Sequence, residues 1–148
     1  MTVGLPVTVL IATGPFEPDL SAARVARAID RGLQAGGLPP SELCPLQAAT
    51  GTDGDLRAEL DALDFDARMR RSRAVVIGAA RLDRRTLADS VAFELATRAR
   101  QAGVPAYAVA RESSLDSFEA RIMDLGAIVL AGDARRLAAA GRRLARVL

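Results

Sequence analysis

Short apolar runs alternate along this chain with stretches whose apolar residues recur at helical spacing. Residues 7–12, 74–77 and 105–110 form the three most continuous apolar runs. A strand buried on both faces needs such a run, whereas a half-exposed strand alternates apolar and polar positions. These three segments therefore predict interior strands of a parallel sheet. Two weaker runs, 43–46, which Pro45 interrupts, and 127–130, predict two further strands.

The stretches between these runs carry apolar residues three or four positions apart, the spacing of one helix face. This spacing predicts helices over residues 20–35, 56–63, 65–70, 87–102, 115–125 and 134–147. The helix over 87–102 is the clearest, with an inward stripe made of Leu87, Val91, Leu95 and Ala99. Gly103 is its expected C-cap. The last helix is expected to bury Leu137, Leu144 and Val147.

Strands that alternate with helices of this length are joined by right-handed crossovers, so helices cover both faces of the sheet. The 148 residues suit one domain. The sequence therefore predicts an α/β fold: a single three-layer αβα domain over 1–148, with a five-stranded parallel sheet in a flavodoxin-like, Rossmann-like arrangement. Ligands of such sheets lie outside the carboxyl ends of the strands. The loops 13–19, 47–55, 78–85, 111–114 and 131–133 share that edge.

Composition and charge narrow the range of partners. Aromatic residues make up 3% of the chain, too few for the stacking surfaces that bind single-stranded nucleic acid. The arginines of 68–73 and of the last helix have acidic neighbours, and the net charge is only +2, so we expect solvated helix faces and no nucleic-acid partner. No run approaches ~18 apolar residues, and no signal peptide is evident, so we expect no membrane partner. The single cysteine, Cys44, cannot form an intrachain disulfide, which fits a reducing, cytoplasmic setting.

The chain contains neither lysine nor histidine, so lysine nucleophiles, P-loop lysines and histidine bases are absent. Cys44 lies beside Pro45 in a weak strand, where a buried, unreactive thiol is expected. In the loop 13–19, Gly14 lies where a helix N-terminus could hold an anion. The alternative is that Asp19 simply caps that helix.

The loop 78–85 is the most polar one that follows a well-defined strand. Arg81 can donate two hydrogen bonds to a phosphate or carboxylate, and Asp83 can accept a proton. The alternative is that Asp83 pairs with an arginine and that Asp83 or Thr86 caps the next helix. We predict no metal site, and a ligand that touches Gly14, Gly78, Arg81 or Asp83.

Two segments resemble the glycerate kinase family of bacterial enzymes that phosphorylate D-glycerate with ATP. The first segment is residues 9–33, in which an apolar strand leads through T-G-P-F-E-P-D-L-S-A into a helix. The family begins in a similar way, with an apolar strand, the motif P-D-S-F-K-G-S-L-S-A and a helix. In residues 65–110, V-V-I-G-A-A-R-L-D-R-R-T-L and A-G-V-P-A-Y-A-V-A are similar to V-I-T-G-E-G-R-L-D-x-Q-T and G-V-P-V-x-A-x-A. The resemblance carries over to Gly78, Arg81 and Asp83, and also to Phe16, Leu20, Ser21 and Ala22.

The departures from this family concern charged positions. The family's Asp and Lys fall on Gly14 and Glu17, and its Glu falls on Ala79 or Ala80. Of the motif A-D-G-G-E-G-T, residues 51–54 retain only a faint trace. The family's enzymes have two domains, and the resemblance implies that the second is absent here, deleted between about residues 46 and 64.

These departures predict a truncated glycerate-kinase-like protein that no longer transfers phosphoryl groups. It would act as a binding or interaction module for a small anionic metabolite or a nucleotide. The alternative is an active glycerate kinase that uses Asp83, Arg81 and Asp53 or Asp55, with ATP and Mg²⁺, and completes its site by oligomerising. A third hypothesis is that the chain is a structural partner of a full-length kinase. The partners considered besides a ligand are therefore a second copy of the chain or a full-length kinase.

Overall fold

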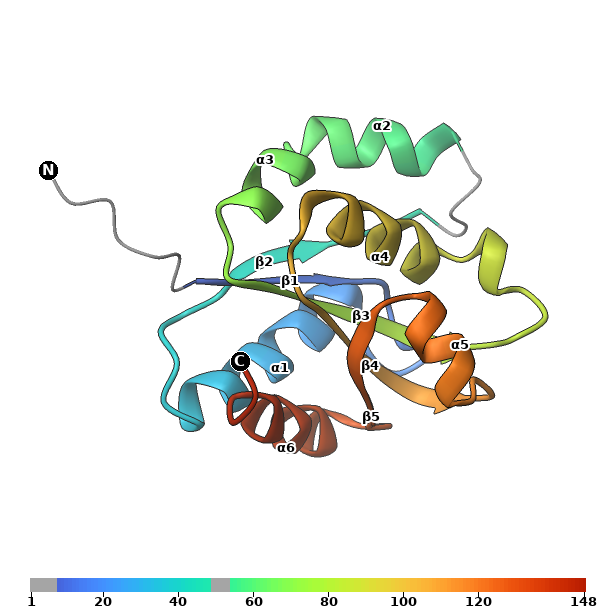
Figure 1. Cartoon of the computed structure of the whole chain (residues 1–148). Helices are drawn as coiled ribbons and strands as arrows, with labels where there is room; N and C mark the ends of the chain where they lie inside the picture. The colour runs from blue at the N-terminus through green and yellow to red at the C-terminus, as the bar shows by residue number, and fades with distance from the viewer. Residues whose placement is uncertain (1–7, 49–53) are drawn as a thin grey trace, which may run out of the picture.

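The computed structural model describes residues 8–48 and 54–148, and strands alternate with helices along them (Figure 1). The elements are, in chain order, β1 (Val9–Thr13), α1 (Ala22–Ala35), β2 (Glu42–Pro45), α2 (Gly54–Ala62), α3 (Phe65–Arg70), β3 (Ala74–Leu82), the 3₁₀ turn η1 (Leu87–Asp89), α4 (Val91–Ala102), β4 (Ala106–Ser113), α5 (Ser117–Ile122), β5 (Leu125–Leu130) and α6 (Ala134–Leu144).

All five strands are parallel and lie in the order β2-β1-β3-β4-β5. The predicted α/β fold, with a five-stranded parallel sheet in a flavodoxin-like order, is confirmed. The three most continuous apolar runs supply β1, β3 and β4, which are the interior strands as expected. The predicted first strand began at Val7, which lies outside the described residues.

Helices cover both faces of the sheet, and each face has its own apolar core. The helices α1 and α6 pack on one face, while α2, α3 and α4 lie over the other (Figure 1). Alternate residues of β1 serve the two cores: Leu10 and Ala12 face the α4 side, and Val9 and Ile11 face the α1 side. Because both faces are covered, the four positions Val9–Ala12 are all apolar, which explains the continuous run, and only the last residue of β1, Thr13, is polar.

Several predicted boundaries are wrong at the carboxyl edge of the sheet. The strand β3 does not end at Gly78 but continues to Leu82, and β4 continues to Ser113. Polar residues in these extensions look like loop in the sequence, yet the two strands still pair there, with Arg81 opposite Glu112.

The expected caps and one expected core residue also need correction. Ser21, not Asp19, caps α1, because its side chain accepts the backbone N–H of Arg24 at 3.2 Å. The helix predicted over 87–102 is interrupted: α4 begins after Ser90, which caps it in place of Asp83 or Thr86. Val147 does not face inward but lies 59% exposed beyond the end of α6. Gly103 does end α4, in the left-handed conformation expected of a C-cap glycine.

No helix in the described part of the chain is both long and apolar enough to span a lipid bilayer.

Candidate functional site

Three of the four predicted site residues meet in one groove at the carboxyl edge of the sheet. Gly14, Gly78 and Arg81 line a hollow of about 600 Å³, together with the start of α4 and the segment after β2. The strands β2 and β3 flank β1 on opposite sides, so the chain changes direction here. Open α/β sheets bind their ligands at such a switch point. We call this hollow the β1–β3 groove.

Asp83 lies outside the β1–β3 groove. It lines a smaller hollow of about 180 Å³ with Arg81, Glu112 and Ser114, so Arg81 alone borders both spaces. The Asp83 carboxylate accepts the backbone N–H of Arg85 at 2.9 Å. Asp83 forms no ion pair within residues 8–48 and 54–148, so the alternative that it pairs with an arginine is wrong.

The guanidinium of Arg81 already has an anionic partner. Its Nε lies 2.6 Å from a carboxylate oxygen of Glu112, at the matching position of β4. Both side chains are well exposed, at 68% and 60%. Exposed ion pairs stabilise a protein by about 0–1 kcal/mol. A ligand anion can therefore displace Glu112 at little energetic cost.

Gly78 has a structural reason to be glycine. A β-carbon there would lie 2.5 Å from Thr13 Oγ1 and 2.6 Å from Thr13 Cβ. The neighbouring strand therefore excludes a side chain at this position. Gly14 differs, because a β-carbon there would meet nothing within 4 Å. Its backbone N–H donates to the Gly78 carbonyl at 3.0 Å, which fixes the turn after β1 at the groove.

The N-terminus of α4 closes one end of the groove, which the sequence analysis missed. Ser90 accepts the N–H of Phe93 at 3.0 Å, and its hydroxyl donates to the Leu87 carbonyl at 2.7 Å. The N–H groups of Val91 and Ala92, which line the groove, have no partner among the described residues. Unpaired N–H groups of a first helical turn attract anions. The signal in the sequence was Ser90 itself, a typical N-cap directly before Val91.

A second set of backbone donors at this edge is already occupied. After β2, the N–H groups of Gln47 and Ala48 both donate to the carboxylate of Glu59 in α2, at 2.8–3.1 Å. The chain's own carboxylate thus takes the place that a ligand anion could fill. The predicted trace of an acidic motif at residues 51–53, including Asp53, lies outside the described residues.

The turn that follows β1 is held by one arginine of β4. Arg111 donates to the carbonyls of Phe16 and Glu17 and lies over the Phe16 ring, 5.5 Å from its centre. It also approaches the carboxylate of Asp19 at 3.8 Å. Glu17, which the resemblance aligns with the family's lysine, is not among the residues that line the β1–β3 groove.

Acidic groups outnumber basic ones around the site. Asp89 lines the β1–β3 groove beside Arg81, and Asp83 and Glu112 border the smaller hollow. Even so, the described residues contain no cluster of three or more groups that could hold a metal ion. Cys44 is fully buried, and burial raises the pKa of its thiol, so it has the expected character of an unreactive core residue.

Comparison with known proteins places these features in a family. The sequence profile of the glycerate kinase family matches residues 58–146, more than half of the chain. This range contains Gly78, Arg81 and Asp83 but not Gly14. A search of curated protein sequences gives no significant match.

A solved structure with a similar fold is a diflavin flavoprotein A3 from Nostoc sp.. The two chains superpose with a TM-score of 0.52 at 15% identity, over 98% of this chain and 94% of that one. At this identity the similarity concerns the fold alone.

Proposed function

This chain belongs to the glycerate kinase family, and from that premise we propose that it binds a small anionic metabolite or a nucleotide in the β1–β3 groove without transferring a phosphoryl group. We also propose a cytoplasmic setting, because the one cysteine of the chain, Cys44, is a buried free thiol, which suits a reducing compartment.

The observation that carries the binding role is the convergence of donors on the groove. The guanidinium of Arg81 and the unpaired N–H groups of Val91 and Ala92 come from β3 and α4, and they border one hollow. A volume of about 600 Å³ lies within the range of small-molecule sites. The groove walls also include apolar side chains, which suit the uncharged part of a metabolite or nucleotide.

The same site lacks what phosphoryl transfer requires. Charge that develops on a transferring phosphoryl group is stabilised by cations held around it, usually Mg²⁺ together with lysine or arginine. Here no lysine exists in the chain, and alanines stand at the family's Glu position. Asp89 adds negative charge to the groove itself. These features support binding without turnover.

Binding is tested by calorimetry and thermal shift with ATP, ADP, D-glycerate and phosphorylated three-carbon acids, each with and without Mg²⁺. A ligand at 100 times its dissociation constant stabilises the fold by about 2.7 kcal/mol. We expect Arg81→Ala to weaken binding about tenfold or more and to change stability by under about 0.5 kcal/mol, since the side chain is exposed.

The matched control is Arg85→Ala, four residues away, whose side chain is exposed and lines neither hollow. It should bind like the unmodified chain. Equal affinity of the Arg81→Ala variant, or equal loss in the control, would show that the ligand does not use the β1–β3 groove as described.

A second candidate, an active kinase, is supported by the small hollow that Arg81 and Asp83 share. Its site would use Asp53 or Asp55 as well and would be completed by a second subunit, with ATP and Mg²⁺ bound. Coupled release of ADP with D-glycerate separates the two functions. We expect no turnover; a rate above about 1 s⁻¹ that rises steeply with protein concentration would favour the kinase.

A further inference from the structure

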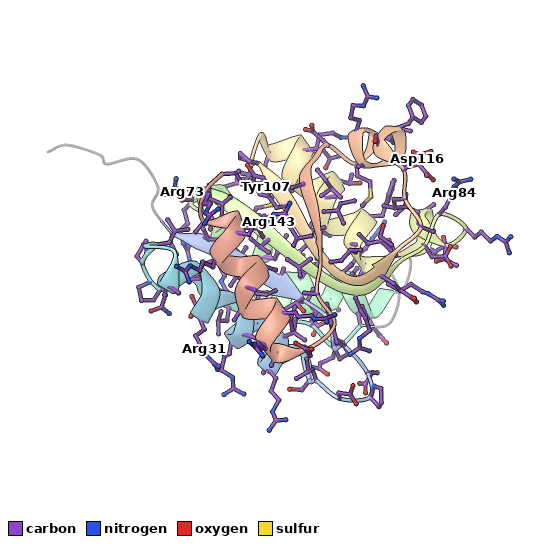
Figure 2. All side chains as sticks on the ribbon, turned by 90° about the horizontal axis from the view of Figure 1, so that it is seen from below. Arg31, Arg73, Arg84, Tyr107, Asp116 and Arg143 are labelled. Atoms are coloured by element: carbon purple, nitrogen blue, oxygen red, sulfur yellow. The ribbon has the colours of Figure 1, made fainter. Side chains whose placement is uncertain are left out.

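A second hollow lies at the opposite edge of the sheet from the β1–β3 groove. Its volume is about 620 Å³, and the segments that lead into β3 and β4 line it. Figure 2 shows Arg73, just before β3, on the opposite side of the molecule from Arg84, which follows β3. We call it the amino-edge hollow; its walls include Arg70, Arg73, Val104, Pro105, Tyr107 and Val147.

Two arginines of the amino-edge hollow have free guanidinium groups. Four arginines lie close together before β3, and Glu42 of β2 engages two of them. Its carboxylate lies 3.4 Å from Arg68 Nε and 3.8 Å from Arg71 Nη2. The other two, Arg70 and Arg73, line the hollow, and their side chains form no ion pair or hydrogen bond within residues 8–48 and 54–148. These two remain available to a ligand.

No acidic side chain in the described part of the chain lines the hollow to balance these two charges. Leu148 also lines it, but its terminal carboxylate forms no ion pair with Arg70 or Arg73. Residues 1–7, which lead into β1, lie outside the described residues, and their sequence contains neither Asp nor Glu. The amino-edge hollow therefore has a positive charge that the described side chains around it leave uncompensated.

Tyr107 adds an aromatic ring and a hydroxyl at a place that is shaped for them. A β-carbon at Gly126 of β5 would lie 2.6 Å from the Tyr107 ring, so the glycine leaves room for the ring. The register between β4 and β5 also shifts at Tyr107. Such irregularities often re-aim a side chain beside a binding site. The Tyr107 hydroxyl has no hydrogen-bond partner among the described residues, so it can donate to a ligand.

The remaining wall of the hollow is apolar. Val104 and Pro105 come from the turn between α4 and β4, and Val147 comes from the segment after α6. Val147 is 59% exposed, so a ligand that covers it removes apolar surface from water. Small-molecule sites combine such walls with a few polar groups that fix orientation, and they have similar volumes.

We propose that the amino-edge hollow binds a phosphate monoester that carries an apolar or aromatic body. Such a phosphate has a charge of about −1.5 to −2 at pH 7, which the two free guanidinium groups match. Arginine also fits phosphate oxygens with paired hydrogen bonds. The body of the ligand would lie on Val104 and Pro105, beside the Tyr107 ring. This site does not depend on the function proposed for the β1–β3 groove.

The test is a titration of the isotope-labelled chain with phenyl phosphate to about 10 mM, followed by the backbone amide signals. We expect a dissociation constant on the order of 1 mM, as for other ligands of this size. The signals of Gly103, Val104 and Tyr107 should move with it. Inorganic phosphate and phenol each carry one half of the probe, so each should bind these residues at least about tenfold more weakly.

The decisive variant combines Arg70→Ala with Arg73→Ala and should weaken binding at least about tenfold, because it removes both charged donors. Tyr107→Phe should weaken binding less. The matched control combines Arg57→Ala with Arg85→Ala, since both side chains are exposed, form no ion pair in the described part of the chain and line neither hollow. It removes the same charge and should bind like the unmodified chain. Circular dichroism should show an intact fold in each variant.

Three outcomes overturn the proposal: no movement of the Gly103, Val104 and Tyr107 signals at about 10 mM phenyl phosphate, full affinity in the variant that lacks both arginines, or an equal loss in the control. Movement confined to Gly14 and Gly78 would place the probe in the β1–β3 groove and would overturn it as well. Arg81→Ala, which disables that groove, should leave binding at the amino edge unchanged.

Discussion

Replacing Gly78 by alanine separates two explanations for a glycine at the candidate site. The family resemblance suggests a glycine that lets a ligand approach, whereas the packing around it suggests a glycine that lets two strands approach. An added β-carbon would lie 2.5 Å from Thr13 Oγ1 and 2.6 Å from Thr13 Cβ. Thr13 is fully buried, so neither atom can move without displacing β1 or the core.

The expected loss of stability follows from this clash. Overpacking a well-packed core costs about 1–3 kcal/mol. Alanine recovers about 0.4–1 kcal/mol, because it restricts the unfolded chain more than glycine does. We therefore expect Gly78→Ala to lower the free energy of unfolding by about 1–2 kcal/mol. For a chain of this size, that corresponds to a fall in Tm of about 2–8 °C.

Urea unfolding of four variants measures the effect. Gly14→Ala is the control, because its β-carbon meets nothing within 4 Å, and its stability should change by under about 0.5 kcal/mol. Thr13→Gly removes both clashing atoms, so the pair Thr13→Gly and Gly78→Ala should be more stable than the sum of the single changes predicts. A Gly78→Ala variant that is fully stable but binds ligand poorly would refute the packing explanation.

Three further predictions concern the core, the thiol and α5. Gly32→Ala places a β-carbon against the Ala138 carbonyl oxygen at the crossing of α1 and α6, so it should cost at least about 2 kcal/mol in chemical unfolding. Gly54→Ala, with nothing within 4 Å of the added β-carbon, should be nearly neutral. Cys44 should react with a thiol reagent only at the rate of unfolding, since burial shields the thiol and raises its pKa; fast reaction of the folded chain would contradict this. The backbone N–H of Glu119 donates to the Asp116 carboxylate and lowers its pKa. The stability that this contact gives α5 is therefore fully present above about pH 3.9, the ordinary pKa of Asp. It is lost as the pH falls through the lowered pKa. Amide exchange at Glu119 should report that loss, and Asp116→Asn should abolish its pH dependence.

The sheet could be predicted because burial on both faces leaves a plain signature. The runs that became β1, β3 and β4 are apolar at nearly every position, which neither a helix face nor a half-exposed strand requires. The ends of these strands could not be predicted in the same way. The pairing of Arg81 with Glu112 extends β3 and β4 beyond the core, and the pattern of a single strand does not show which residue lies opposite on its neighbour.

The candidate site was only partly visible in the sequence for a similar reason. Gly14 and Gly78 could be placed together, because the carboxyl ends of adjacent parallel strands meet at one edge. Two other features of the site could not be predicted. Glu112 pairs with Arg81, and the Glu59 carboxylate accepts the N–H groups of Gln47 and Ala48, so both depend on contacts between residues 11 to 31 positions apart. Such contacts decide which donors remain free for a ligand, and local patterns do not encode them.

The distribution of charge bears on which ligand the β1–β3 groove can accept. The α1 and α6 layer and its flanks carry eight arginines: Arg24, Arg27, Arg31, Arg135, Arg136, Arg142, Arg143 and Arg146. Only two carboxylates, Asp30 and Asp133, lie among them, a balance of +6; since the whole chain carries +2, the rest carries −4. Figure 2 shows Arg31 and Arg143 on this side, away from Arg84 and Asp116.

The groove opens beside α4, outside the arginine-rich α1 and α6 layer, and Asp89 lines it, so we expect a polyphosphate that enters it to meet net repulsion. A singly charged acid, or a nucleotide whose charge Mg²⁺ has reduced, meets less repulsion and can still use Arg81 and the α4 N-terminus. If this repulsion limits binding, the affinity of the groove for ATP without Mg²⁺ should rise with ionic strength, because salt screens repulsion between separated charges more than it weakens short contacts. Affinity that instead falls steeply with salt would mean that attraction from the arginines dominates, and the charge argument against phosphoryl transfer would fail with it.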